Sequence, residues 1–198
     1  MSNVRILGIA GSLRRDSYNR AALRAAQQLA PEGVQIEIYD IDGFPGFNQD
    51  EDQQPPAKVA DFKQKIRDSD AILFVTPEYN YSVPGVLKNA IDWASRPYGD
   101  SAWDGKPAAI MGASIGGIAT ARAQYHLRQI MVFLNMFPLN KPEVMIGHAQ
   151  NVFDADGNLT DEVTKGYIRD LLQNLVEWTR LILRKSGAAG NNPSLIVS

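Results

Sequence analysis

Cysteine is absent from the 198-residue sequence. Its absence excludes disulfide bonds, thiolate zinc sites, iron–sulfur clusters and cysteine nucleophiles. The sequence also lacks an excess of one charge sign, because 20 Lys and Arg residues nearly balance 22 Asp and Glu residues. A nucleic-acid backbone requires a basic surface, so we expect no nucleic-acid partner and instead a small uncharged or mixed-charge ligand.

Long hydrophobic runs are missing too. No apolar stretch approaches the length that crosses a membrane, and residues 1–3 lead into a strand pattern rather than a secretion signal. We therefore expect a cytoplasmic protein with no membrane partner. The length fits a single domain, which we place at residues 1–185, followed by a flexible C-terminal tail at 186–198.

Apolar segments alternate with helical patterns along the chain. Continuous apolar runs at 4–10, 71–75 and 107–113 predict strands that are buried on both faces of a parallel sheet. Residues 34–39 alternate apolar and polar side chains, which is typical of a strand at a sheet edge, and a fifth strand fits 143–147. The pattern predicts an α/β fold with a doubly wound sheet of five parallel strands in the order 2-1-3-4-5.

The loop after the first predicted strand, 11–19, is rich in hydroxyl, amide and guanidinium groups. Ser17 is placed to cap the next helix, with Arg14 and Arg15 beside it. Unpaired amides at a helix start attract anions, and these side chains add charge-assisted hydrogen bonds to phosphate. The loop has neither a dinucleotide nor a P-loop motif, which leaves a phosphomonoester. The alternative is that Ser17 is only a cap and both arginines are solvated.

Two further loops follow the third and fourth predicted strands. Residues 76–81 carry two tyrosines, an amide and a carboxylate, which suit a flat ring with polar edges; the alternative is an ordinary turn. Residues 114–117 contain two glycines, which allow close approach of a ligand to the backbone. All three loops fall at one end of the predicted sheet. Together they predict a site for flavin mononucleotide (FMN), with its phosphate on the first loop.

A competing hypothesis rests on residues 112–116, which read G-x-S-x-G between a strand and a helix. This is the nucleophile-elbow pattern of serine hydrolases, with Ser114 as the nucleophile. The two histidines are His126, about three turns along the following helix, and His148, whose one evident acidic partner is Glu143. We rank this hypothesis below the FMN site and interpret both histidines as structural.

The second half of the chain contains two predicted helices. The first, at about 118–136, is apolar on every side of its C-terminal half, where Val132 and Phe133 lie opposite the main apolar face. That surface predicts cover by a second subunit; the alternative is that both residues pack under the last helix or the tail. Residues 153–158 begin like a calcium loop but lack its final glutamate, so we expect a turn. Thr160 is expected to cap the last helix.

Three segments of the sequence resemble one protein family. They are GSLRRDSYN at 11–19, TPEYNYSVPGVLKNAIDW at 76–93, and GASIGGIATARAQYHLRQIMVFL at 112–134 followed by NKPEV. They are similar to the NADPH-dependent FMN reductase family, close to its bacterial chromate, quinone and azo-dye reductases, and the similarity covers residues 4 to 180. The resemblance implies a flavodoxin-like fold with FMN as cofactor and NADH or NADPH as co-substrate.

The resemblance also implies where FMN is held. The phosphate contacts, with two neighbouring residues, fall on Ser12, Leu13, Arg14, Ser17, Tyr18 and Asn19. The isoalloxazine contacts fall on Pro77, Glu78, Tyr79, Asn80, Ser114, Gly116 and Gly117. Backbone donors of the two glycines are expected to stabilise negative charge at the N1 and O2 side of the ring. The flavin itself carries the hydride, so no protein acid or base and no metal is implied.

The implied activity is a ping-pong reaction. NAD(P)H reduces FMN at N5 and leaves, and a quinone or another acceptor such as chromate, an azo dye, a ferric complex or free flavin then takes two electrons. The resemblance further implies a homodimer that pairs into a homotetramer, with Arg122, Tyr125 and Glu143 at the second contact. The alternative is a flavodoxin-like electron carrier, although such carriers are strongly acidic and this chain has a net charge of only -2.

Overall fold

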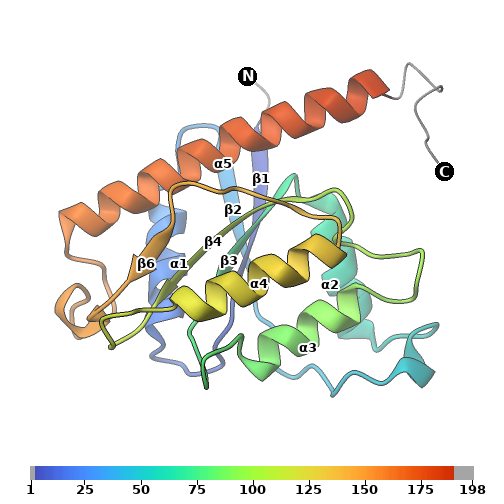
Figure 1. The fold of residues 1–198 in the computed structure, drawn as a ribbon, viewed down its shortest axis with the longest axis horizontal. Helices are drawn as coiled ribbons and strands as arrows, with labels where there is room; N and C mark the ends of the chain where they lie inside the picture. The colour runs from blue at the N-terminus through green and yellow to red at the C-terminus, as the bar shows by residue number, and fades with distance from the viewer. Residues whose placement is uncertain (1–2, 190–198) are drawn as a thin grey trace.

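The structure, a computed structural model, describes the backbone of residues 3–189 and the side chains of residues 3–184. A parallel sheet lies between helices (Figure 1). Its strands are β1 (Val4–Ala10), β2 (Val34–Tyr39), β3 (Ala71–Val75), β4 (Pro107–Ala113), β5 (Phe137–Pro138) and β6 (Val144–Ile146). The helices are α1 (Tyr18–Gln28), α2 (Ala57–Asp68), α3 (Gly85–Ala94), α4 (Ala121–Phe133) and α5 (Glu162–Ala189).

The strand order is β2-β1-β3-β4-β5, with β6 also paired to β4, so the predicted doubly wound order is confirmed. Every residue of β3 and β4 is buried, as is all of β1 except Arg5. Strands covered by helices on both faces read as continuous apolar runs for this reason. Strand β2 lies at the edge and exposes most of its length, as its alternating pattern predicts.

The fifth position of the sheet differs from the single strand predicted at 143–147. Strand β5 pairs with the start of β4, where Phe137 lies opposite Pro107, and β6 pairs with its end, where Ile146 lies opposite Ala113. The chain leaves the sheet after Pro138 and returns at Val144, and Pro142, which has no N–H to donate to a ladder, lies in the gap.

The boundaries of two helices also differ from the prediction. Helix α4 begins at Ala121 rather than near 118, because Ala119 has a left-handed φ of 55° that no helix residue adopts. Helix α5 is capped by Asp161 and not by Thr160: the Asp161 carboxylate accepts a 2.7 Å hydrogen bond from the Thr164 amide. The Thr160 hydroxyl donates instead to the Val152 carbonyl.

Helix α5 continues to Ala189 (Figure 1), so residues 186–189 of the predicted tail have helical backbone. Residues 190–198, the rest of that predicted tail, lie outside the described residues. The long helix runs across the sheet from one side of the molecule to the other.

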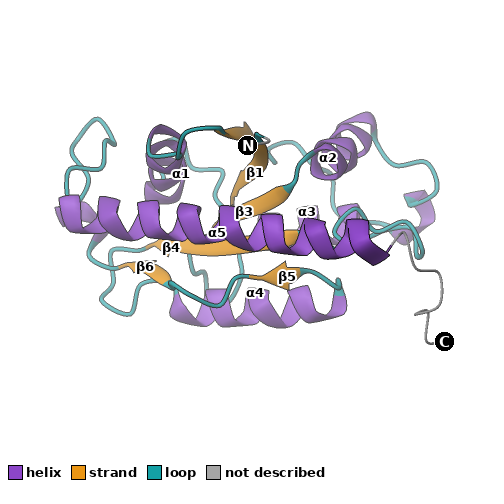
Figure 2. Ribbon diagram, turned by 90° about the horizontal axis from the view of Figure 1, so that it is seen from above, coloured by secondary structure: helices purple, strands orange, loops and turns teal. Residues whose placement is uncertain are grey.

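Two apolar cores form, one on each face of the sheet. One joins α1 and α5 to the strands, and the other joins α2, α3 and α4 to the strands around Phe62, Phe74 and Trp103. Helix α4 lies beside β5 and β6, away from α1 and α2 (Figure 2). Since both faces are covered, the carboxyl ends of the strands are left as the place where loops can form a site.

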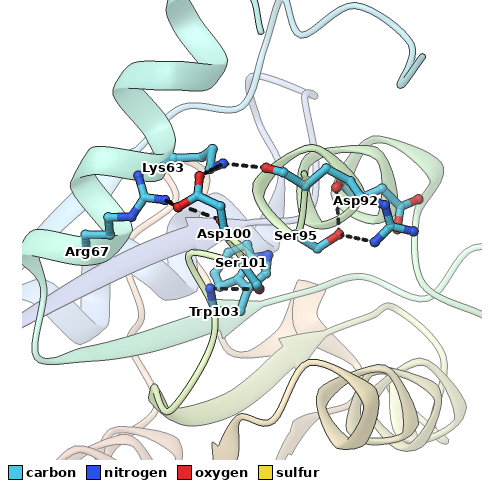
Figure 3. Close-up of polar contacts among 8 residues, drawn as sticks. Lys63, Arg67, Asp92, Ser95, Asp100, Ser101 and Trp103 are labelled. Carbon is cyan, nitrogen blue, oxygen red and sulfur yellow. Dashed lines mark hydrogen bonds and ion pairs between the residues drawn. The ribbon is translucent and has the colours of Figure 1, made fainter. Parts of the chain in front are cut away.

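The side chain of a buried lysine connects α2 to the loop between α3 and β4 through an ion pair and a hydrogen bond (Figure 3). The Lys63 ammonium is almost fully buried, forms an ion pair with Asp100 at 2.8 Å and donates to the Arg96 carbonyl. Arg67 joins the same carboxylate at 2.7 Å, and together the two cations hold the pKa of Asp100 below its usual range. The loop is therefore fixed against α2 although its own sequence is polar.

We expect Gly112→Ala to destabilise the fold. A Cβ at Gly112 would lie 2.2 Å from the Thr76 carbonyl oxygen, a backbone atom directly after β3 that cannot move freely. Overpacking of this kind costs about 1–3 kcal/mol, and Tm falls by about 2–4 °C per kcal/mol at this chain length. Thermal unfolding followed by circular dichroism measures the change. The control is Gly46→Ala, which meets nothing within 4 Å; equal Tm values for both variants would contradict the clash.

Candidate functional site

The loop between β1 and α1 is built around two buried serines. Ser17 caps α1 as predicted, because its hydroxyl accepts a hydrogen bond from the Asn19 amide at 3.2 Å. The Ser12 hydroxyl accepts from the Arg14 amide at 3.3 Å and lies 3.4 Å from the Tyr79 hydroxyl. The Arg14 guanidinium lies over the Tyr18 ring, 5.9 Å from its centroid. Sequence-predicted phosphate residues are thus gathered at the start of one helix.

The donors of this loop fit a phosphomonoester. The amides of Leu13, Arg15 and Asp16 donate to no other described residue, and they precede the start of α1. Amides at a helix N-terminus carry partial positive charge, and the nearby hydroxyls and the Arg14 guanidinium can add charge-assisted hydrogen bonds. The loop therefore has the chemistry that the FMN phosphate requires.

The Asn19 side chain also forms hydrogen bonds with the backbone of a distant strand, which its position in the sequence does not indicate. Its side-chain carbonyl accepts from the Ala113 amide, and its side-chain amide donates to the Ala113 carbonyl, both at 2.8 Å. One amide hydrogen of Asn19 remains for another acceptor. This pair of hydrogen bonds joins the loop after β1 to the end of β4, 94 residues away in the chain.

The loop after β3 forms a tight turn at its tip. Tyr79 and Ser82 exchange backbone hydrogen bonds at 3.0 Å, and the two residues between them, Asn80 and Tyr81, have positive φ angles of 49° and 68°. Two consecutive left-handed residues are the mark of a type I′ turn, which asparagine tolerates well. The turn leaves Tyr79 half-exposed beside Ser12, where an aromatic face is open to a ligand.

Glu78 points away from the open part of the loop. Its carboxylate is 6% exposed, accepts from the amides of Arg122 at 3.0 Å and Ala123 at 3.1 Å, and pairs with the Arg122 guanidinium. Burial alone would raise the pKa of this carboxyl, but Arg122 and the two amides outweigh it and lower the pKa. Because Thr120 makes no side-chain cap, Glu78 caps α4 from another loop. The Glu78 carboxylate is therefore already bonded within the protein.

The loop after β4 combines an open glycine with a crowded one. The amide of Gly116 donates to the Ser114 hydroxyl at 3.2 Å, and a Cβ at Gly116 would meet only that hydroxyl, at 3.7 Å. At Gly117 a Cβ would come within 3.2 Å of the His148 ring. Ile115 and Ile118 are exposed on either side. The loop therefore exposes apolar side chains next to its two glycines.

The hydrolase hypothesis does not fit this geometry. Among the described residues, Ser114 forms no hydrogen bond with a histidine. His126 bonds instead to the Ser82 hydroxyl at 2.9 Å, and the acid suggested for His148, Glu143, contacts Tyr125 at 3.5 Å. Residues 3–184 therefore assemble no catalytic triad around Ser114, and the G-x-S-x-G match there reflects a strand-to-helix turn.

Sequence reasoning missed two connections that hold the ring loop in place. Glu78 reaches the start of α4 across 44 residues of chain, and Ser82 bonds to His126 on the same helix. A further contact places the Arg122 guanidinium 3.6 Å from the centre of the Tyr81 ring. No local pattern signals these pairs, because each partner is typical of an exposed turn or helix when considered alone.

Two other predictions concern metals and membranes. Residues 154–158 form the expected turn, in which the Asp154 carboxylate accepts from the amides of Asp156 and Asn158. Within residues 3–189, no group of three or more acidic or histidine side chains is placed to hold a metal ion. No helix in that same range is long and apolar enough to cross a membrane.

A parallel sheet in this order, with helices on both faces and polar loops at the carboxyl ends of β1, β3 and β4, defines the class of flavodoxin-like α/β domains. The chain belongs, within that class, to the NADPH-dependent FMN reductase family, whose family model matches residues 4–151. The resemblance noted in the three loop segments is confirmed by that match.

Relatives in the family are similar over nearly their whole length. The chain is 57% identical to the NAD(P)H-dependent FMN reductase PA1204 of Pseudomonas aeruginosa, over 90% of this chain and 96% of that protein. It is 46% identical to a 2-hydroxy-1,4-benzoquinone reductase of a Burkholderia species, over 89% and 97%. Among solved structures, the flavoenzyme NAD(P)H:(acceptor) oxidoreductase FerB of Paracoccus denitrificans superposes with a TM-score of 0.83 at 38% identity, covering 89% of this chain and 97% of FerB.

We expect the contribution of Glu78 to stability to depend on pH. Its folded-state pKa lies below the ordinary value of 4.5, so the ionised group stabilises the fold at neutral pH and this stabilisation is lost as the pH falls through the folded pKa. Glu78→Gln should lower the free energy of unfolding at pH 7 by about 1–3 kcal/mol, and the difference should shrink as the pH falls below 4.5.

Urea denaturation at several pH values measures this difference. The control is Glu32→Gln, since Glu32 is exposed and has no ion pair among the described residues. A deficit of Glu78→Gln that stays constant from pH 7 to pH 3.5 would show that the charge of Glu78 does not hold α4.

Proposed function

We propose that the protein is an FMN-dependent NAD(P)H:acceptor oxidoreductase whose main acceptors are quinones. The observation that carries this proposal is the convergence of three loops, one with donors for a phosphomonoester and two that frame an open, partly aromatic platform. When bound, FMN supplies hydride acceptance at N5 from NAD(P)H and two-electron transfer to a second substrate, in ping-pong order. Family membership supports the same cofactor.

In this proposal, residues of the chain bind FMN and orient it. Ser12, Arg14, Ser17 and the free amides of the first loop hold the phosphate. Asn19 keeps that loop against the end of β4 and has one hydrogen left for the phosphate. The remaining proposed ring contacts are Pro77, Glu78, Tyr79, Asn80, Ser114, Gly116 and Gly117; Glu78 contributes its backbone, because its carboxylate is bonded to the start of α4. The amides of the two glycines stabilise negative charge on the pyrimidine side of the ring.

An open platform explains the proposed range of acceptors. Ile115 and Ile118 are exposed beside the glycines, so a flat apolar molecule can stack there without entering an enclosed pocket. The benzoquinone reductase relative supports quinones as acceptors. We include chromate, azo dyes, ferric complexes and free flavin in the proposal because none of them requires a dedicated acid or base from the protein. The reaction is proposed to take place in the cytoplasm.

We also propose a homodimer built on the outer face of α4. Val132 is 78% exposed and Phe133 is 74% exposed, so neither packs under α5 within the described structure. A cavity of about 400 Å³ opens beside them, lined by Tyr98, Leu134 and Asn135 among others. Exposed apolar surface next to a cavity is typical of an interaction site.

Pairing of two dimers into a homotetramer is proposed at a different surface. Tyr125 and Glu143 lie 3.5 Å apart there. Arg122 is already paired with Glu78, and its guanidinium also covers Tyr81, which leaves it less free to form the new contact. The proposed contact between dimers therefore depends mainly on Tyr125 and Glu143.

The visible spectrum of the purified protein tests the proposed function. We expect flavin absorbance that bleaches when NADH or NADPH is added without oxygen, and steady NAD(P)H oxidation once a quinone is present. A protein that stays colourless after incubation with FMN would overturn the proposal, and labelling of Ser114 by a fluorophosphonate would revive the hydrolase. Flavin reduction without steady NAD(P)H turnover would indicate an electron carrier instead.

We expect Arg14→Ala to weaken FMN binding without unfolding the chain. Loss of one charged hydrogen bond to phosphate costs about 1.5–3 kcal/mol, which raises the FMN Kd about tenfold or more. Fluorescence titration of the apoprotein with FMN measures the Kd. The control, Arg5→Ala, removes an arginine from the opposite end of β1 and should leave the Kd unchanged. An unchanged Kd for Arg14→Ala would place the phosphate elsewhere.

We expect Phe133→Glu to convert the dimer into monomers, because it places a charge in the centre of the proposed apolar contact. Light scattering on FMN-loaded protein at micromolar concentration measures the mass. The control is Val163→Glu, an equally drastic change at an exposed apolar residue of α5. A wild-type mass of one chain, or a Phe133→Glu dimer, rules out this interface.

A further inference from the structure

A second cavity lies beside the phosphate loop, on the side away from β3. It has a volume of about 170 Å³, lies between α1 and the end of β2, and is partly open to solvent. Its lining includes Ser12, Arg20, Leu23, Ile38, Tyr39 and Asp40. Only Ser12 belongs to the proposed FMN site, so most of this cavity has no task in the function described above.

The cavity combines an apolar wall with a polar rim. Ile38 is 39% exposed, although Leu23 beside it is fully buried, so an aliphatic surface is open inside the cavity. The rim carries an ion pair in which the Arg20 guanidinium donates to the Asp40 carboxylate at 2.7 Å. A flat, polar-edged ring attached to a hydroxyl-bearing group satisfies both surfaces. The volume suits one such ring and not a whole dinucleotide.

Asp40 retains the capacity to accept further hydrogen bonds. One of its oxygens bonds to Arg20 and the other accepts from the Asp42 amide at 3.1 Å, and each carboxylate oxygen has a second lone pair. Burial acts to raise the pKa of this carboxyl, but the Asp42 amide and the Arg20 guanidinium lower it overall. The group is therefore ionised at neutral pH and acts as an acceptor for hydroxyl groups.

In Rossmann dinucleotide-binding sheets, an acidic residue after the second strand binds the ribose hydroxyls of the nucleotide, and a nearby arginine accommodates a 2′-phosphate. This chain lacks the glycine motif of those sheets, and the likeness is confined to the placement of one acid and one arginine. Asp40 follows β2 directly, and Arg20 projects from the first turn of α1. The FMN loops use the ends of β1, β3 and β4, so the end of β2 is left for a second nucleotide.

We propose that this cavity binds the adenosine half of NAD(P)H, with Asp40 accepting from the ribose hydroxyls and Arg20 beside the 2′ position. The proposal rests on the proposed function, in which NAD(P)H reduces FMN. Strand β2 lies two strand spacings, about 10 Å, from β3, and Ser12 touches both the cavity and Tyr79 of the ring loop. A dinucleotide with its nicotinamide on the platform can therefore reach the cavity. The presence of both Asp40 and Arg20 fits use of NADH as well as NADPH.

Truncated substrate provides the test. Reduced nicotinamide mononucleotide (NMNH) carries the hydride but no adenosine, so its KM should not depend on the cavity. Asp40→Asn and Ile38→Lys are each expected to raise the KM for NADH about tenfold, equivalent to about 1.4 kcal/mol, and to leave both the KM for NMNH and the FMN Kd unchanged. For Arg20→Ala we expect a larger rise in KM with NADPH than with NADH.

The matched control is Glu37→Gln. Glu37 also lies on β2 and pairs with a basic side chain, Lys65, at 2.7 Å, but it lines a different cavity. This variant should leave all three KM values unchanged. An equal rise for NADH and NMNH in Asp40→Asn, or no rise for NADH, would overturn the adenosine subsite.

A direct measurement separates this proposal from the proposed function. Saturation-transfer NMR with adenosine 5′-monophosphate on FMN-loaded protein should show binding that Asp40→Asn abolishes, since the flavin phosphate site is then already filled. No binding at several millimolar overturns the subsite even in an active reductase. Binding by a protein that oxidises neither NADH nor NMNH keeps the adenosine subsite and overturns the reductase instead.

Discussion

The double hydrogen bond between Asn19 and the backbone of Ala113 is the contact on which the arrangement of the site depends. It joins the start of α1 to the end of β4, and it satisfies the backbone amide and carbonyl of the last residue of that strand. Strand β3 lies between β1 and β4, so a clamp across both neighbours also fixes the position of its loop. Without it, three flexible loops would have to order themselves around a ligand at an entropic cost.

The contacts of Glu78 with α4 likewise join two distant segments and fix the loop after β3. The Glu78 carboxylate lies at the start of α4, where unpaired amides favour negative charge, and its partner Arg122 extends over Tyr81. The ring loop is thereby attached to a helix whose inner face is part of the apolar core. Rigid attachment of this kind allows a site to be open to solvent and still hold a defined shape, which suits a platform that admits flat acceptors from outside.

The edge strand β2 and the outer face of α4 expose apolar side chains, whereas the central strands bury theirs. Strand β2 exposes an aliphatic side chain and an ion pair where an edge strand would ordinarily carry solvated charges, and α4 exposes Val132 and Phe133. Each of these surfaces adjoins a cavity. The proposed nucleotide subsite and subunit contact are placed on them for that reason.

Local pattern was sufficient for much of the fold and for part of the site. Strand burial, the edge position of β2, the Ser17 cap and the composition of the three loops are all encoded within a few residues of where they act, because hydrophobic period and capping are local properties. The choice between neighbouring residues was harder: Thr160 and Asp161 are both good caps, and only the packed structure gives that place to Asp161. Pro142 cannot pair in a sheet for a local reason, its missing N–H. Which residues of β4 pair with β5 and which with β6 is decided by the tertiary structure.

Contacts between distant segments were decided by the tertiary structure alone. Whether Glu78 faces a ligand or a helix, whether Asn19 binds phosphate or backbone, and whether Asp40 meets Arg20 all depend on which loops the closed sheet brings together. A side chain's partner across tens of residues is set by sheet order and helix packing, so the same residue types in sequence are compatible with several arrangements. The sequence by itself determined which chemical groups are available at the strand ends, and the tertiary structure decided which of them are already bonded to the protein and which remain free for a ligand.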